Sequence, residues 1–201
     1  MQLKISSKRS LIILAIVGIA FSSTVVFFLM PALSSRGFYT NSTSSISREQ
    51  TASGLPTRIQ IPKINVDAVL EYVGLTSQGA MDVPKGPTDA AWFDLGPRPG
   101  ENGSAVIAGH EGWKNGIAAV FDNLYKLQKG DKVYIKDEKG ATTTFVVREV
   151  RTYGQNDDAS GVFSLSDGKA HLNLITCEGV WNKTQKSYSN RLVVFTDKET
   201  E

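Results

Sequence analysis

Residues 171–177 read His-Leu-Asn-Leu-Ile-Thr-Cys, an apolar run that ends at the chain's single cysteine. This composition predicts a buried strand, and the polar sequence after Cys177 predicts a loop. Because alternate side chains of a strand point to opposite faces, one face carries Asn173, Ile175 and Cys177, and the other carries Leu172, Leu174 and Thr176. Reactive residues are often displayed where a strand of a rigid scaffold ends, so Cys177 is a candidate nucleophile.

Short β-type runs separated by turn signals continue this pattern along the chain. They are residues 58–61, 66–70, 105–108, 132–136, 142–152 and 191–196. The segment from Ile117 to Leu127 predicts the one short amphipathic helix, which Gly130 ends. Seven or eight short strands in roughly 145 residues predict an all-β domain, either a closed barrel or a sandwich.

The composition excludes several classes of protein. The chain has 201 residues, of which 41% are hydrophobic and 21% charged, as in an ordinary folded domain. A single cysteine excludes an intrachain disulfide and any multi-cysteine metal site. The net charge of +2 is too small to indicate nucleic-acid binding. No nucleotide-binding motif occurs, so we expect no cofactor and no metal.

The N-terminal region predicts a membrane anchor. Residues 11–33 contain no charge and, as a helix, would span a hydrocarbon core of about 30 Å. A cleavable signal peptide is the alternative, although its apolar region is usually shorter. Three basic residues precede the span and one follows it, so residues 1–10 are expected in the cytoplasm. Residues 34–56, rich in Ser and Thr, predict a flexible tether to an extracellular domain over residues 57–198.

Two further residues could form a reactive site with Cys177. His110 follows the apolar run 105–108 and is preceded by Gly109, which permits close approach of a substrate. Arg191 opens the last predicted strand. A thiolate attacks carbonyl carbons, a histidine exchanges protons, and an arginine stabilises an oxyanion, so these three residue types suit acyl transfer.

Each of these residues also has a structural interpretation. A lone cysteine is most often a small buried hydrophobic residue, and an arginine is most often a surface charge. An unpaired thiol outside the cell nevertheless favours a functional role for Cys177. His171 lies early in an apolar strand without glycine neighbours, and we expect it to be structural.

These residues resemble the motifs of the sortases, the membrane-anchored cysteine transpeptidases of bacterial surfaces. Residues 174–177, Leu-Ile-Thr-Cys, match the family's nucleophile signature, and Gly109-His110 and residues 190–194 match its histidine and arginine sites. The spacings of 67 and 14 residues between the three sites also agree. The segments around Trp92 and residues 99–106 are most similar to class E and F sortases.

The resemblance implies an eight-stranded β-barrel with one or two short helices and a specific reaction. Cys177 would attack the Thr–Gly carbonyl of an LPxTG-like signal near the C-terminus of a secreted protein. His110 would shuttle protons, Arg191 would bind substrate and stabilise the oxyanion, and Thr176 would either position substrate or be an ordinary strand residue. An amino group from a peptidoglycan precursor or a pilin lysine would resolve the thioacyl intermediate.

The sequence departs from the family pattern at two places. Glu178 follows the cysteine, where class E and F members often carry a small or neutral residue. The tether lacks the Asp-Pro-aromatic triplet of many pilin-polymerising class C enzymes, which favours cell-wall anchoring.

Other functions remain as alternatives. The order of histidine before cysteine disfavours papain-like peptidases, and the sequence around Cys177 lacks the caspase motif. Hydrolysis of the intermediate by water is possible. A non-catalytic anchored barrel could instead bind surface protein or glycan through Trp92, Trp113 and Trp181.

Overall fold

The computed structural model describes residues 53–154, 156–165, 167–184 and 187–200. The predicted membrane segment, residues 11–33, and most of the predicted tether lie outside this part. Within the described residues, no helix has both the length and the apolar character needed to cross a bilayer.

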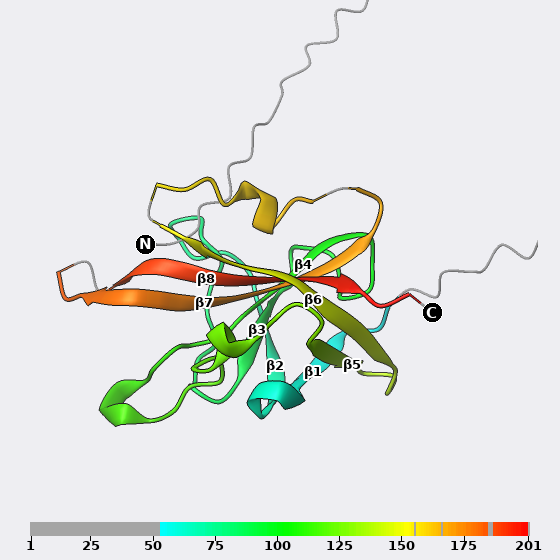
Figure 1. The fold of residues 1–201 in the computed structure, drawn as a ribbon, viewed down its shortest axis with the longest axis horizontal. Coiled ribbons are helices and arrows are strands. Elements are labelled where there is room, and N and C mark those ends of the chain that lie inside the picture. Colours follow the sequence, from blue (N-terminus) through cyan, green and yellow to red (C-terminus); the bar gives the residue numbers. More distant parts are fainter. Residues whose placement is uncertain (1–52, 155, 166, 185–186, 201) are drawn as a thin grey trace, which may run out of the picture. The chain divides into compact units, whose positions relative to one another are not determined.

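Eight strands close into a single barrel (Figure 1). In chain order they are β1 (Pro56–Ile61), β2 (Val66–Val73), β3 (Ala90–Phe93), β4 (Gly103–Ala108), β5 (Lys132–Asp137), β6 (Thr142–Tyr153), β7 (Ala170–Asn182) and β8 (Ser187–Lys198). Around the barrel the order is β1-β2-β3-β4-β7-β8-β6-β5, and β5 pairs with β1 to close it. The β2–β3 and β4–β7 pairs are parallel and the others are antiparallel. The structure therefore confirms the predicted closed eight-stranded barrel.

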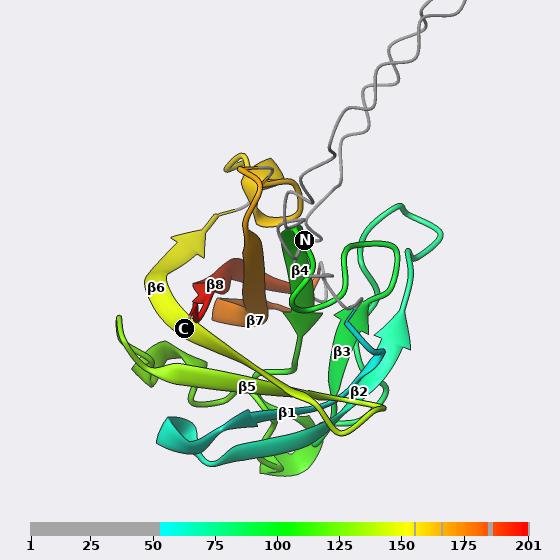
Figure 2. The same ribbon diagram turned by 90° about the vertical axis from the view of Figure 1, so that its right-hand side faces the viewer.

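The barrel interior is filled by alternate residues of the strands. In Figure 2, β1 and β5 lie on one side of this interior, and β4, β7 and β8 lie on the other. The interior side chains are almost all branched aliphatic or aromatic, as in other small barrels. The largest completely buried ones include Ile59, Ile61, Ile107, Phe121, Leu124, Phe145, Leu172 and Leu174.

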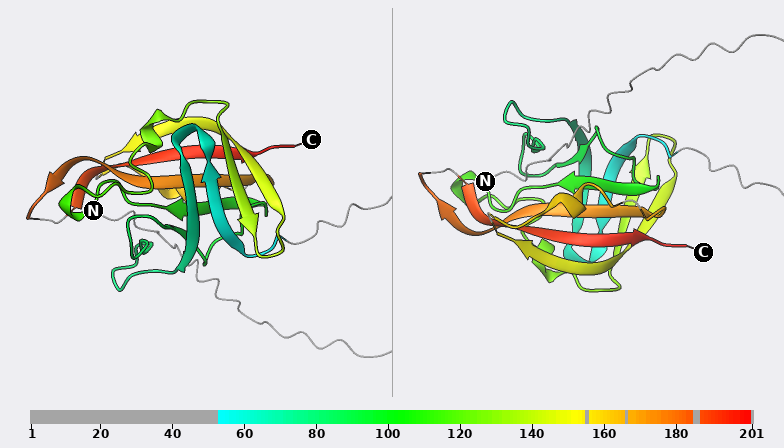
Figure 3. Two further views of the ribbon diagram at one scale, coloured as in Figure 1. Left: turned by 90° about the horizontal axis from the view of Figure 1, so that it is seen from below. Right: turned by 90° about the horizontal axis from the view of Figure 1, so that it is seen from above.

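A second, smaller core covers the outer face of β4, β7 and β8. Here the connection between β6 and β7 packs over the sheet (Figure 3). It places Val162 and Phe163 against Ile175 of β7 and Phe195 of β8. Because β7 is covered on both faces, residues 170–176 are all buried, including the polar residues His171, Asn173 and Thr176.

The predicted helix between Ile117 and Leu127 is wrong. This part of the chain contains only one 3₁₀ turn, η3 (Leu124–Lys126), and another, η2 (Lys114–Gly116), directly precedes it. The apolar spacing arose because Phe121, Leu124 and Leu127 are buried in the barrel core from a loop. The carboxylate of Asp122 accepts hydrogen bonds from the backbone of Gly112 and Ala119, so the loop satisfies its amides without a helix. Two further 3₁₀ turns are η1 (Pro62–Ile64) and η4 (Ser160–Val162).

We predict that Leu174→Ala lowers the free energy of unfolding by about 2–5 kcal/mol, because Leu174 is completely buried in the barrel interior. Leu95→Ala is the matched control, since Leu95 is 67% exposed and its truncation leaves no cavity. Urea unfolding measured by tryptophan fluorescence tests both variants. Equal effects would mean that this part of β7 does not stabilise the barrel.

Candidate active site

Three neighbouring strands bring together the three residues predicted to react. Cys177 of β7 lies directly opposite Arg191 of β8 in the antiparallel register. On the other side of β7, the parallel strand β4 ends at Ala108, which pairs with Ile175. The Gly109 amide donates to the Ile175 carbonyl at 3.0 Å, so His110 emerges beside the segment that carries Cys177.

The sequence predicted Cys177 at the end of one strand and Arg191 at the start of another. The structure places both residues inside strands. Strand β7 continues to Asn182 and β8 begins at Ser187, so both residues lie within a long hairpin. The register shifts between Glu178 and Trp181, where Gly179 has a φ of 88°. Beyond the shift, Trp181 and Tyr188 stack edge to face at 5.2 Å and extend the hairpin.

Thr176 and Gly109 fix the backbone that leads to His110. Thr176 is 4% exposed, and its hydroxyl donates to the Gly109 carbonyl at 2.9 Å. Gly109 has no space for a Cβ, because Phe121 and Val120 lie against it. Thr176 could either position substrate or be an ordinary strand residue. Its hydrogen bond to Gly109 favours the second interpretation.

The imidazole of His110 has two contacts. It packs against Trp113 with ring centroids 4.7 Å apart and ring planes tilted by 58°, and its Nε2 lies 2.8 Å from the Pro84 carbonyl. A carbonyl oxygen only accepts hydrogen bonds, so Nε2 carries a proton and donates it. Nδ1 is therefore the nitrogen that can gain and lose a proton in a reaction. No hydrogen bond joins His110 to Cys177 in this structure.

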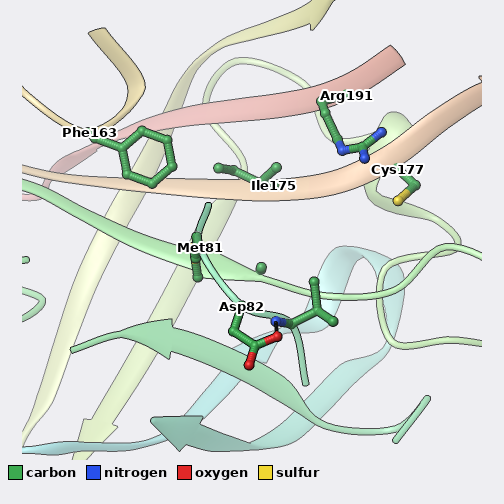
Figure 4. Close-up of a pocket in the computed structure, with 8 residues that line it drawn as sticks. Met81, Asp82, Phe163, Ile175, Cys177 and Arg191 are labelled. Atoms are coloured by element: carbon green, nitrogen blue, oxygen red, sulfur yellow. Dashed lines mark hydrogen bonds between the residues drawn. The ribbon is translucent and has the colours of Figure 1, made fainter. Parts of the chain in front are cut away.

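A groove of about 140 Å³ leads to the thiol and the guanidinium (Figure 4). One wall comes from the connection between β2 and β3, and the other from β7, β8 and the β6–β7 connection. Its lining is mostly apolar and consists of Met81, Asp82, Val83, Ala108, Phe163, Ile175, Cys177 and Arg191. A space of this size admits a group about as large as benzene, so it suits one or two small side chains of an extended peptide.

The guanidinium of Arg191 points toward Cys177 (Figure 4). Its Nη1 donates to the Asn190 carbonyl at 2.8 Å and to the Tyr188 carbonyl at 3.3 Å. These backbone contacts orient a permanent positive charge beside the thiol, where negative charge develops during acyl transfer.

A second hollow, of about 230 Å³, opens on another side of Cys177 and is acidic. Glu111, Asp122 and Glu178 line it, together with Tyr125 and Thr176. The Oε2 atom of Glu111 is buried without a hydrogen-bond partner. Burial raises the pKa of the Glu111 carboxyl, and the nearby carboxylates of Glu178 and Asp122 raise it further. The hollow thus concentrates negative charge close to the nucleophile.

The environment of Cys177 opposes ionisation of the thiol. Burial raises the pKa of Cys177, Arg191 acts in the opposite direction, and Glu111 raises the pKa again. The neutral thiol is therefore the main form near neutral pH, and the reactive thiolate increases as the pH rises.

Several residues of the site had no signal in the sequence. Pro84 acts through a backbone carbonyl, and the groove residues Met81 and Phe163 come from irregular connections. Glu111 could have been noticed, because it directly follows the candidate His110. Trp92 lies in the barrel core, so the three tryptophans do not form the common binding face considered above.

Comparisons with known proteins identify the family of the barrel domain. The sortase domain model matches residues 59–199. Among solved structures, sortase C-1 from Actinomyces oris is 25% identical over 72% of this chain and 74% of its own, with a TM-score of 0.56. A lid mutant of sortase A from Corynebacterium diphtheriae is 23% identical over 76% and 75%, with a TM-score of 0.57. A search of curated proteins found no match.

A family of cysteine transpeptidases is therefore indicated by both the fold and the domain match. The chain belongs to the sortase family. The assignment to class E or F stays a prediction.

We predict that Glu111→Gln speeds alkylation of Cys177 by iodoacetamide at pH 7 by about 2- to 10-fold, because removing a nearby negative charge lowers the pKa of the thiol. Arg191→Ala should slow the same reaction, since it removes the charge that favours the thiolate. The measurement is the alkylation rate from pH 6 to 10, read by intact-protein mass.

Glu138→Gln is the control, because Glu138 lies in the turn after β5 and lines neither the groove nor the acidic hollow. A rate profile unchanged by Glu111→Gln would show that this carboxylate does not influence the thiol.

Proposed function

We propose that this sortase cleaves an LPxTG-like sorting signal near the C-terminus of secreted proteins and transfers each protein to an amino acceptor at the cell surface. The observation that best supports this function is the position of Cys177, opposite Arg191 and beside the strand that leads to His110. The groove of the site suits an extended peptide, because its lining is apolar and it ends at the thiol.

In the first half-reaction the Cys177 thiolate attacks the threonine carbonyl carbon of the signal. The carbonyl oxygen becomes negative, and Arg191 stabilises it. His110, protonated at Nδ1, donates that proton to the glycine nitrogen as the C–N bond breaks. The glycine-side fragment leaves with a free amine, and the rest of the protein stays on Cys177 as a thioester.

In the second half-reaction an amine attacks the thioester carbonyl. His110 removes a proton from the amine as the new C–N bond forms, and the C–S bond breaks to release the Cys177 thiolate. The acceptor is an amino group of a peptidoglycan precursor or a pilin lysine, and the absence of the Asp-Pro-aromatic triplet favours the former. Water in place of the amine would give hydrolysis.

The acidic hollow is the proposed approach for the acceptor. Its carboxylates attract an ammonium group close to the thioester, where the group loses one proton to solvent before the neutral amine attacks. Glu178, the residue that departs from the family pattern, lines this hollow and accepts a hydrogen bond from Thr152 at 2.6 Å. An acceptor with a positively charged amine is therefore favoured.

The proposed cellular location rests on the N-terminal sequence. We propose that residues 11–33 anchor the chain in the membrane once, with residues 1–10 in the cytoplasm and the barrel outside. This arrangement places the groove where secreted proteins emerge.

We predict that Cys177→Ala abolishes both half-reactions and that His110→Ala and Arg191→Ala each lower kcat/KM at least ~10²-fold. The assay uses the full chain in mild detergent, a small library of LPxTG-type peptides and an amine, with products identified by mass. Arg58→Ala, on the exposed surface of β1, is the matched control for Arg191→Ala.

Each result has a defined meaning. A Cys177 adduct with ligated product supports the transpeptidase, and an adduct with only hydrolysed product supports a peptidase. Near wild-type turnover in His110→Ala or Arg191→Ala would refute that residue's role. No adduct from folded protein with a free thiol would favour the non-catalytic binding barrel.

We predict that Glu178→Gln raises the KM for the amine acceptor about 2- to 5-fold while thioester formation changes little, because only the acceptor step uses the negative charge. Single-turnover acylation and steady-state ligation, measured on the same protein, separate the two steps. A change in acylation alone would contradict this use of the hollow.

A further inference from the structure

The outer face of β7 carries two buried polar residues that do not line the groove. His171 and Asn173 lie on the same face as Ile175 and Cys177, and they are only 2% and 1% exposed. Buried polar side chains are costly unless they are hydrogen-bonded, so their partners indicate what they do. Both residues bind the connection between β6 and β7.

His171 is held between two carboxylates. Its Nδ1 lies 2.8 Å from Asp197 of β8, and its Nε2 lies 2.9 Å from Asp167 of the connection. Arg148 of β6 binds the same Asp197 oxygen at 3.1 Å, and the Lys169 amide binds Asp167 at 2.9 Å. From β4, the residue paired with His171 is the uncharged Ser104.

This arrangement requires the charged form of the imidazole. An ionised carboxylate only accepts hydrogen bonds, so both ring nitrogens must carry a proton for both bonds to form. A neutral His171 has one N–H and can keep only one of them. The bond to Asp167 and the bond to Asp197 therefore exist together only while His171 is an imidazolium.

Asn173 holds the middle of the same connection. Its Nδ2 donates to the Val162 carbonyl at 2.7 Å, in a fully buried contact. The next residue, Phe163, stacks edge to face on Phe93 at 5.8 Å and lines the groove that ends at Cys177. One wall of the groove is thus fastened to β7 at two points, Asp167 and Val162.

We propose that His171 and Asn173 are positioning residues that hold Phe163 in the groove wall, and that only doubly protonated His171 completes this arrangement. The proposal rests on the proposed function for its effect on peptide binding. Neither residue touches the reacting atoms, so their effect is on peptide affinity and not on the reactivity of the thiol.

The pH dependence has a definite sign. A neutral His171 keeps only one of its two bonds, so peptide affinity is lower for the neutral imidazole than for the imidazolium. Hydrogen bonds from His171 and from the Lys169 amide lower the pKa of Asp167, so this carboxylate stays ionised into mildly acidic solution. Affinity is therefore greatest while His171 is charged and Asp167 is ionised, and it falls when Asp167 becomes protonated.

The first test uses Asp167→Ala, because Asp167 is 42% exposed and its removal leaves the core intact. Hydrogen exchange of the full chain in mild detergent, without peptide, should show faster exchange in residues 156–165. Asp94→Ala, an exposed carboxylate after β3, is the control. Unchanged exchange in Asp167→Ala would overturn the proposal whether or not the chain is a transpeptidase.

The second test measures the consequence for the groove. In a Cys177→Ala background, Asp167→Ala should weaken binding of an LPxTG-type peptide about 3- to 10-fold at pH 6 and less at pH 9, which is the scale of one ordinary net hydrogen bond. Asp167→Asn, which keeps the acceptor oxygen, should retain part of the affinity. In the wild-type background, alkylation of Cys177 by iodoacetamide should be unchanged by Asp167→Ala.

The outcomes separate the two proposals. Faster exchange without any peptide binding in the parent protein would support the fastening of the connection and refute the sorting-signal function. Peptide binding that is insensitive to Asp167→Ala, or a parallel loss of alkylation rate, would overturn the positioning role. His171→Gln, if it folds, should reproduce the Asp167→Ala affinities and abolish their dependence on pH.

Discussion

The parallel pairing of β4 with β7 is the constraint on which the active site depends. Parallel strands have their carboxyl ends at the same edge of a sheet, so the residue after β4 and the reactive residue of β7 become neighbours although 67 positions separate them. The Thr176 hydroxyl then donates to the Gly109 carbonyl, and the Ile175 carbonyl accepts from the Gly109 amide. The antiparallel pairing of β8 adds Arg191 opposite the thiol.

The burial of β7 on both faces links stability to function. Its inward residues Leu172 and Leu174 fill the barrel, and its outward residues hold the β6–β7 connection and line the groove. A change on the inner face therefore affects the packing of the barrel, and a change on the outer face affects the wall of the groove. This differs from a sheet with one solvated face, where the outer residues can vary with little consequence.

The charges around the thiol divide the site into two parts. Arg191 belongs to the apolar groove, whereas Glu111 and Glu178 belong to the acidic hollow. Burial raises the pKa of Cys177, and Arg191 and Glu111 shift it in opposite directions, so the thiol of the free enzyme is mostly neutral near neutral pH. A peptide that fills the groove and an amine that enters the hollow would meet at the same sulfur from different directions, which suits a reaction in two half-steps.

The sequence alone determined the all-β class, most strand positions and the three candidate residues, because these are local properties. Alternation, β-branched runs and the residue types Cys177, His110 and Arg191 are visible without any distant contact. Strand β3 was missed, since Ala90–Phe93 is short and its pattern is wholly apolar. The predicted helix at Ile117–Leu127 was wrong, because loop residues buried at irregular intervals imitate helical spacing.

Only the tertiary structure decided which strands are neighbours, and therefore which chemical groups meet. The backbone carbonyl of Pro84 beside His110 and the groove wall formed by Met81 and Phe163 come from connections whose conformation no local pattern specifies. His171 is an ordinary strand histidine in the sequence, and becomes a link between Asp167 and Asp197 only when β7, β8 and the connection are packed together. Strand propensity depends on neighbours along the chain, whereas these contacts depend on the closure of the barrel.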